Sequence, residues 1–333
     1  MSDQRPSQIV PTVDFDKDGV QHGFLRLPYS RDDSAWGSVM IPICVIRNGR
    51  GPAALLTGGN HGDEYEGPLA LYELAHTLDP KHISGTVIIV PAMNYPAFRA
   101  GTRTSPIDKG NLNRSFPGRP AGTVTEKIAD YFQRELLPRS DIALDFHSGG
   151  KTLDFVPFCA AHIRPDKVLE AQGFAAVEAF SAPWSMKMLE IDAVGMFDTA
   201  AEEMGKLFIT TELGGGGTSR AETVRIARRG VLNVLRHAGI VAGAVEKIRT
   251  KWLDMPSADC FSFAEDDGMI ETMLDLGEVV AEGQVVARIH SVGRTGIAPR
   301  EIKAKMSGML AARHFPGLVK AGDCVAVVAV LIR

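Results

Sequence analysis

A histidine and a glutamate stand three residues apart in a glycine-rich stretch of the sequence. They are His61 and Glu64, within the run GGNHGDEYEG at 58–67. This run follows an apolar segment at 53–56 and precedes an apolar-patterned segment at 68–78, which is typical of a turn between a buried strand and a helix. A tight turn can direct both side chains at one point, and an imidazole with a carboxylate is a ligand pair that suits Zn²⁺.

A third ligand is needed, because a catalytic zinc site uses three protein ligands and keeps one position open for water. His147 is our candidate, since it ends the expected strand 142–146 within the run DFHSGG, beside glycines that leave space. We therefore predict one Zn²⁺ per chain, held by His61, Glu64 and His147. Asp145 is a candidate to orient the site, although we expect strand alternation to turn its side chain away from His147.

An acidic residue also ends another expected strand. The apolar run 206–211 leads to Glu212, which is followed by a leucine and four glycines. A carboxylate beside an activated water molecule can take its proton and pass it to the leaving amine, which is general acid and base catalysis. We expect Glu212 to do this work.

The long segment 94–122 is rich in Arg, Asn, Gly and Pro. Ordered loops of this length tend to be functional. Arg103, and Asn113 with Arg114, offer guanidinium and amide donors there. An arginine can hold a carboxylate through two parallel hydrogen bonds, and it can stabilise the oxyanion that forms when water attacks an amide carbonyl. One arginine for each task is chemically sensible.

Short apolar runs alternate with helical patterns through the middle of the chain. Strands are expected at 38–46, 53–56, 86–91, 142–146 and 206–211, and helices near 65–78, 123–136, 166–180 and 219–239. The alternation predicts an α/β fold with a mixed or mostly parallel sheet covered by helices on both faces. Four chemical motifs would then meet at one sheet edge, where open α/β sheets place their ligand sites. The stretch 184–196 is hard to assign.

Composition divides the chain into three expected parts. Residues 1–50 form a β-rich lead-in, 51–250 the catalytic domain, and 251–333 an all-β domain. An internal repeat marks this last part, where GMI at 268–270 recurs as GML at 308–310. Its glycine spacing is similar to that of lipoyl/biotinyl half-barrels, but the lysine that carries their cofactor has no clear counterpart. We therefore expect a structural role.

The overall composition argues against several classes of protein. The net charge of −4 over 333 residues leaves no basic stripe for nucleic acid. We find no signal peptide and no apolar run long enough to span a membrane, so we expect a cytoplasmic protein with no membrane partner. The four cysteines lack CxxC spacing, which indicates reduced thiols. The sequence does not decide whether the chain forms a homo-oligomer.

Taken in order, four motifs resemble the succinylglutamate desuccinylase/aspartoacylase family. They are GGNHGDEYEG, NLNRSFPG, DFHSGG and TELGGGG, and the resemblance covers about residues 50–240. The C-terminal β domain also fits. The resemblance implies a zinc-dependent amidohydrolase with a carboxypeptidase-like mixed sheet flanked by helices.

The resemblance also implies roles for single residues. A His-x-x-Glu pair and a later histidine bind zinc in the family, which corresponds to the three ligands predicted above. The glutamate that ends the later strand is the base, here Glu212. The Asn-Arg pair binds the substrate carboxylate, here Asn113 and Arg114, and an upstream arginine polarises the scissile carbonyl. Arg103 matches that arginine best, and Arg99 stays an alternative.

Within the family, the chain is most similar to the deacetylases of ectoine breakdown. This implies hydrolysis of a small N-acyl amino acid, N-α-acetyl-L-2,4-diaminobutyrate, to L-2,4-diaminobutyrate and acetate. We place no extra cation for an acidic substrate in 155–205, and Glu190, Asp192 or Asp198 could meet an amine instead. The alternatives are a succinyl- or aspartyl-type deacylase, a metallocarboxypeptidase, or a non-catalytic binding or carrier protein.

Overall fold

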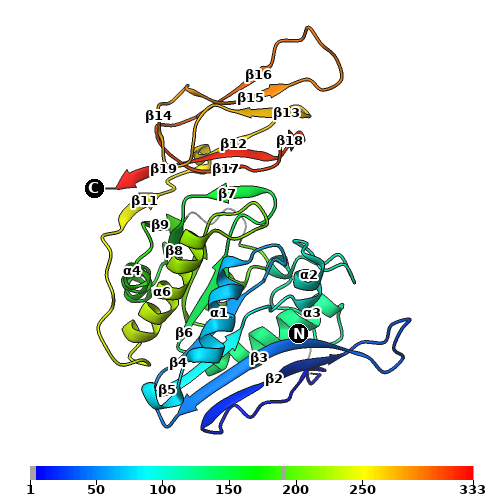
Figure 1. Cartoon of the computed structure of the whole chain (residues 1–333), viewed down its shortest axis with the longest axis vertical. Coiled ribbons are helices and arrows are strands. Elements are labelled where there is room, and N and C mark those ends of the chain that lie inside the picture. The colour runs from blue at the N-terminus through cyan, green and yellow to red at the C-terminus, as the bar shows by residue number, and fades with distance from the viewer. Residues whose placement is uncertain (1–4, 189–192, 333) are drawn as a thin grey trace.

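The computed structural model describes residues 5–188 and 193–332. Within them, a mixed sheet of 15 strands extends through the molecule, and a separate antiparallel sheet of four strands lies in the C-terminal part. Figure 1 shows the C-terminal strands stacked at one end of a larger body that holds the helices. The α/β fold class expected from the sequence, with its C-terminal β domain, is confirmed.

The larger sheet draws its strands from the whole length of the chain. They are β1 (Val10–Pro11), β2 (Gly19–Pro28), β3 (Ser38–Asn48), β4 (Ala53–Gly58), β5 (Gly85–Val90), β6 (Ile142–His147), β7 (Leu153–Phe155), β8 (Phe158–His162), β9 (Trp184–Met188), β10 (Leu207–Glu212), β11 (Lys251–Asp254), β12 (Phe261–Phe263), β14 (Val279–Val280), β17 (Gly308–His314) and β19 (Cys324–Ile332). The smaller sheet contains β13 (Gly268–Thr272), β15 (Val285–His290), β16 (Arg300–Lys303) and β18 (Leu318–Val319). The α-helices are α1 (Glu66–Thr77), α2 (Tyr95–Ala100), α3 (Val124–Tyr131), α4 (Lys167–Phe180), α5 (Phe197–Glu203) and α6 (Ala221–His237).

Four parallel strands at the centre of the larger sheet position the chemical motifs. Their spatial order is β5, β4, β6 and β10, and each pairs in parallel with the next. The register places Gly58 beside Phe146, and His147 beside Glu212. The carboxyl ends of β4, β6 and β10 therefore open onto one edge of the sheet, as the sequence predicted.

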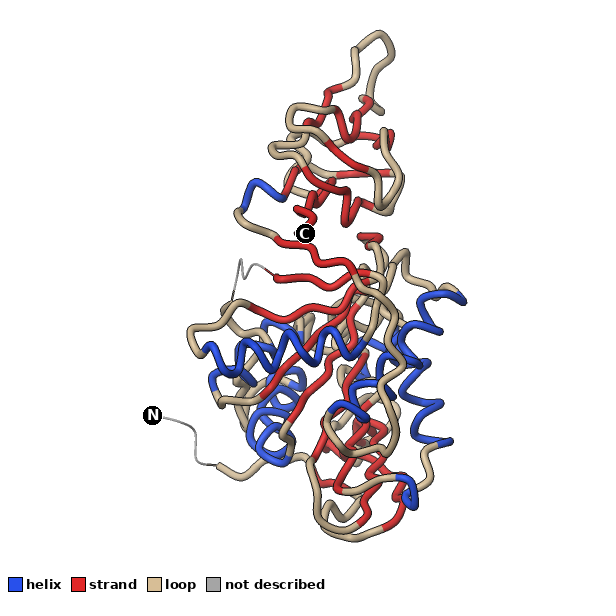
Figure 2. The backbone as a smooth tube through the Cα atoms, turned by 90° about the vertical axis from the view of Figure 1, so that its left-hand side faces the viewer, coloured by secondary structure: helices blue, strands red, loops and turns tan. Residues whose placement is uncertain are grey.

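Helices cover both faces of this sheet. Strand side chains alternate between the faces, so Leu56 packs into the core under α1, α4 and α6, whereas its neighbour Leu55 packs into the core under α3 and α5. Figure 2 shows helices on both sides of the central strands. Because both faces are covered, the central strands are almost continuously apolar, which is typical of buried parallel strands.

The N-terminal strands extend the central sheet. Strand β3 pairs antiparallel with β5, and β2 pairs with β3 along its whole length. The first 50 residues thus contribute β1, β2 and β3 to the larger sheet. The boundaries that we assigned to the three domains stay a prediction, because these strands share one sheet with the strands that follow.

The internal repeat of the C-terminal part is visible in its strand pairing. β13, β14 and β15 form the first half, and β17, β18 and β19 the second. Each half gives its short middle strand to the other, since β14 pairs with β17 and β18 pairs with β13. The exchange interlocks the halves around a shared apolar core, which neither half could bury alone.

Most helices begin and end close to the positions expected from the sequence. The capping box of α3 is present, with the Thr123 hydroxyl accepting from the Glu126 amide and the Glu126 carboxylate accepting from the Thr123 amide. Several elements were missed. The segment 94–122, which we treated as a loop, contains α2, and the unassigned stretch 184–196 begins with β9. Strands β7 and β8 and helix α5 were not expected from the sequence either. Across the described ranges, we find no helix with the length and apolarity needed to cross a membrane.

Gly67 allows α1 to lie against β6, and this contact gives a first prediction. A Cβ at this position would overlap the Cβ of Phe146, whereas a Cβ at Gly173 in α4 would make an ordinary 3.4 Å contact with Ala161. We expect Gly67→Ala to lower the free energy of unfolding by about 1–3 kcal/mol, because overpacking forces the backbone to shift.

The matched variant Gly173→Ala should raise that free energy by about 0.5–1 kcal/mol, because alanine loses less conformational freedom in a helix. Denaturant unfolding of the two variants and the wild type would measure both changes. Equal stability of the two variants would contradict the packing argument.

Candidate active site

The three predicted metal ligands meet in the structure. His61 and Glu64 lie in the turn between β4 and α1, and His147 is the last residue of β6. Nδ1 of His61 lies 2.7 Å from Oε1 of Glu64, and Nδ1 of His147 lies 3.0 Å from Oε2. One candidate ligand atom from each residue lies within 4.8 Å of the others. His61 and Glu64 are buried, and His147 is nearly so.

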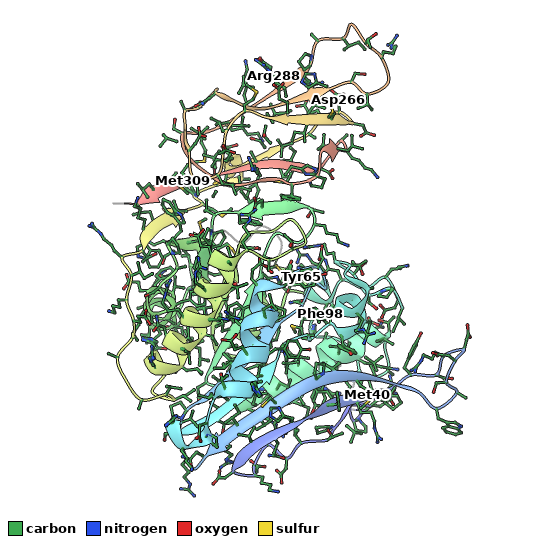
Figure 3. The ribbon with its side chains drawn as sticks, viewed as in Figure 1. Met40, Tyr65, Phe98, Asp266, Arg288 and Met309 are labelled. Atoms are coloured by element: carbon green, nitrogen blue, oxygen red, sulfur yellow. The ribbon has the colours of Figure 1, made fainter. Side chains whose placement is uncertain are left out.

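Close packing fixes the turn that carries His61 and Glu64. A Cβ at Gly62 would overlap the backbone of Ala97 in α2, so only glycine fits there. Tyr65 also packs edge-on against Phe98 of α2, with 5.8 Å between ring centroids (Figure 3). These contacts hold the turn against α2, and the first of them explains the glycine at position 62.

Asp145 contacts the imidazole of His147. Its Oδ2 lies 2.8 Å from Nε2 of His147, which leaves Nδ1 directed toward Glu64. The expectation that Asp145 points away was wrong, because residues two apart on a strand share a face. Asp145 also accepts hydrogen bonds from Thr57 and from Asn60. A carboxylate on the outer nitrogen of a ligand histidine is the usual partner in zinc sites.

The two imidazoles differ in their electrostatics. Burial lowers the pKa of His61, and the charge of Glu64 opposes this only in part. Burial also lowers the pKa of His147, but Asp145 and Glu64 together raise it well above its usual value. The pKa of Glu64 is below its usual range, because the two imidazoles outweigh the effect of burial. Glu64 is therefore a carboxylate between two ring nitrogens.

This set of donors fits a divalent metal ion. Two imidazole nitrogens and one carboxylate are the donors of many catalytic zinc sites, and all three converge from buried positions. The partner that such a site needs on an outer nitrogen is present at Asp145. His61, Glu64 and His147 are therefore the residues that would hold the ion.

Glu212 lies at the carboxyl end of β10, in register with His147. Burial, and then the charge of Glu64, raise its pKa to about 8. Among the described residues, no hydrogen-bond partner reaches its buried Oε2 atom. A carboxyl group that gains and loses a proton near neutral pH can act as general acid and base.

A cavity of about 180 Å³ connects these groups with the segment 94–122. Arg103, Asn113, Arg114 and Glu212 line it together with the three candidate ligands. Nη1 of Arg103 lies 3.8 Å from Oε1 of Glu64. Arg99, the alternative to Arg103, is exposed on α2, where it donates to the hydroxyl of Tyr95. The residues to which we assigned roles thus line one cavity, while the roles themselves stay predictions.

A second, mostly apolar cavity of about 380 Å³ adjoins the first. Both cavities are lined by Arg114, Glu212 and the apolar side chains of Leu153, Phe155, Met188 and Met196. The C-terminal strands supply another part of its wall, through Phe261, Phe263 and Val327. The β domain therefore contributes to the surroundings of the site.

The structure also adds residues that sequence reasoning left open or missed. Asp198, one of three residues that we considered for an amine, lines the first cavity, whereas Glu190 and Asp192 fall outside the described residues. His162, to which we gave no role, lies beside Asp198 and lines the second cavity. No spacing in the sequence links these two positions, because they are brought together only by the fold.

The fold and the cavity define a class of protein, the carboxypeptidase-like amidohydrolases. The comparison with family models then gives the family. The chain belongs to the succinylglutamate desuccinylase/aspartoacylase family, whose catalytic-domain model matches residues 50–238. It is therefore an enzyme, a hydrolase of amide bonds, and the resemblance seen in its motifs is confirmed.

Three relatives illustrate how closely the chain matches this family. An N-alpha-acetyl-L-2,4-diaminobutyric acid deacetylase from Halomonas elongata is 54% identical over 99% of this chain and 97% of its own. The product-bound ectoine utilization protein EutE (DoeB) from Ruegeria pomeroyi is 64% identical, with a TM-score of 0.97 over 98% of this chain and 100% of its own. A succinylglutamate desuccinylase from Silicibacter sp. TM1040 is 63% identical, with a TM-score of 0.96 over 99% and 100%.

The contact between Asp145 and His147 gives the second prediction. We expect Asp145→Asn to weaken zinc binding about 10- to 100-fold, because an amide holds the imidazole less firmly and makes it a weaker base. Asp141→Asn is the matched control, since Asp141 is exposed just before β6, at the far end of the strand from His147. Titration with a competing chelator would measure both affinities. Equal affinities would show that Asp145 does not support the site.

Proposed function

We propose that the protein is a zinc-dependent deacetylase that converts N-α-acetyl-L-2,4-diaminobutyrate and water into L-2,4-diaminobutyrate and acetate. The observation that carries this proposal is the buried His61, Glu64 and His147 group, which shares a cavity with Glu212 and two arginines. The names of the Halomonas and Ruegeria relatives support the choice of substrate. The volume of the cavity suits a small molecule.

The three ligands would hold one Zn²⁺ per chain at the edge of the sheet. Zinc bound there would polarise the acyl carbonyl and lower the pKa of water, so that a nucleophile is available at neutral pH. Glu64 is suited to this place, because its pKa is low and it keeps its negative charge. Asp145 would keep the ring of His147 in the orientation that presents Nδ1.

Glu212 would move the proton during the reaction. The oxygen of water forms a bond to the acetyl carbon, and the bond from that carbon to nitrogen breaks. Glu212 accepts a proton from the attacking water and delivers it to the leaving nitrogen, so that the carboxyl group returns to its initial state. Burial and the charge of Glu64 raise the pKa of Glu212 to about 8. A divalent cation held beside it would lower that pKa and favour the carboxylate form that accepts the proton.

The cations of the cavity would bind the oxygen atoms of the substrate. Arg103 would donate to the acetyl oxygen, on which negative charge develops. Arg114, with the Asn113 amide, would hold the α-carboxylate. Oδ1 of Asn113 accepts from the Phe197 amide, so the NH₂ group of Asn113 is the part that can serve a ligand. A cytoplasmic location stays a prediction, and the oligomeric state stays open.

Replacement of Glu212 gives the third prediction. Glu212→Gln should lower kcat by about 10²- to 10⁴-fold, because glutamine cannot transfer a proton. The zinc content should stay at that of the wild type, since Glu212 is not one of the ligands. Acetate release and metal analysis on the same sample would measure both. Retained turnover would contradict the role of Glu212, and loss of zinc would make it a ligand instead.

Acetate release by the wild type gives the fourth prediction. We expect the purified protein to release acetate from N-α-acetyl-L-2,4-diaminobutyrate, to contain about one zinc per chain, and to lose activity with a chelator. Added zinc should restore the activity. Zinc without acetate release would keep the site and direct attention to succinyl and aspartyl substrates. Activity that resists the chelator would contradict zinc dependence.

A further inference from the structure

Asp198 is a buried carboxylate on the wall of the cavity, and the proposed reaction gives it no part. It is the second residue of α5, and only 5% of its surface is exposed. Its Oδ1 accepts from the backbone amide of Thr199, whereas Oδ2 lies 4.0 Å from Nε2 of His162, beyond hydrogen-bond distance. A buried carboxylate is costly unless a cation or hydrogen-bond donors compensate its charge.

The neighbours of Asp198 do not neutralise it fully. His162 lies between two carboxylates, because its other ring nitrogen, Nδ1, is 3.3 Å from Oε1 of Glu202. One imidazole carries at most one positive charge, so a protonated His162 can balance only one of these two carboxylates when both are ionised. Burial raises the pKa of Asp198, and a cation in the cavity would reduce the cost of ionising it.

Asp198 also lies close to the group that would hold the substrate carboxylate. Oδ1 of Asn113 is 3.0 Å from the amide nitrogen of Phe197, the residue just before Asp198. Arg114, Asn113 and Asp198 all line the same cavity. A ligand of a few atoms can therefore place a negative group at the first two and a positive group at the third. A small diamino acid has this distribution of charge.

We propose that Asp198 is a specificity residue that binds the distal ammonium group of the substrate by a charge-assisted hydrogen bond. The inference rests on the proposed function for the identity of the substrate. Asp198 would exclude acyl amino acids that have an acidic side chain. The side-chain carboxylate of such a substrate would lie against the carboxylate of Asp198, with no proton or cation between them. His162 and Glu202 are positioning residues behind it.

Ligand binding by the zinc-loaded full-length protein tests this inference separately from catalysis. Calorimetry would compare L-2,4-diaminobutyrate with L-norvaline, which has a methyl group in place of the distal ammonium. The wild type should bind L-2,4-diaminobutyrate about 30-fold more tightly or better, because a buried charge pair is lost with norvaline. Asp198→Asn should abolish this preference and change the affinity for norvaline by less than about threefold.

The choice of Asp198→Asn and the control Glu203→Gln excludes two other causes of a lost preference, a disturbed helix and a changed net charge. Asparagine has nearly the shape of aspartate, and its oxygen can still accept from Thr199, so the start of α5 should persist. Glu203→Gln makes the same change of charge at an exposed position of the same helix, and it should keep the preference of the wild type. A loss of preference in Glu203→Gln as well would assign the effect to net charge and overturn the inference.

Three further results of the binding experiment would contradict the role of Asp198. A preference that survives in Asp198→Asn, an equal loss of affinity for both ligands, or no binding of either ligand by the wild type would overturn the inference. Parallel assays of acetate release keep the two proposals apart. If ligand binding depends on Asp198 but the wild type releases no acetate, only the proposed function is contradicted. If Asp198→Asn leaves hydrolysis unchanged, only the specificity role of Asp198 is contradicted.

Discussion

A fully buried carboxylate, Asp145, is the constraint on which the candidate site depends. Its two oxygens accept from Thr57 of β4 and from Asn60 in the turn that follows, and one of them contacts His147 of β6. Burial of a charge would cost several kcal/mol without such partners, so the three groups must keep their places. The turn carries His61, and the end of β6 carries His147. One carboxylate therefore sets how the two predicted imidazole ligands lie relative to each other.

The same sheet edge holds two further carboxyl groups, those of Glu64 and Glu212, whose surroundings drive their pKa values apart. Glu64 lies between two imidazoles, which lower its pKa despite burial. Glu212 is only partly buried as a whole residue, but its carboxyl group is desolvated and faces the charge of Glu64, and these two effects raise its pKa to about 8. Neighbouring carboxyl groups that differ in this way can take different tasks, one as a charged ligand and the other as a proton carrier. The parallel register of β6 and β10 brings Glu212 to this edge beside His147, whose charge opposes part of the rise in the pKa of Glu212.

The sequence predicted the parts of the site that depend on strand order, and it missed those that depend on tertiary packing. His61, His147 and Glu212 each follow or end an apolar run, and parallel strands bring such positions to one edge, so their meeting was predictable. Asp145 was judged wrongly only because the period of the strand was misapplied. Asp198 was one of three acidic residues considered for an amine, and the sequence could not select among them, because nothing local indicates that α5 packs against the cavity. Helix α2 was hidden in a segment whose glycines and prolines are typical of loops.

The contact between Asn113 and α5 explains how one cavity can recognise two charges at a fixed separation. The amide oxygen of Asn113 accepts from the first backbone N–H of α5, and the amide of Phe116 donates to the carbonyl of Gly195 just before that helix. The two bonds join positions 84 and 79 residues apart in sequence. The segment 94–122 and the start of α5 thus form one wall of the cavity, and α5 is in turn packed against β10 through Phe197 and Phe208. Under our two proposals, the groups that bind the substrate are therefore held at fixed positions relative to the ligands at the sheet edge.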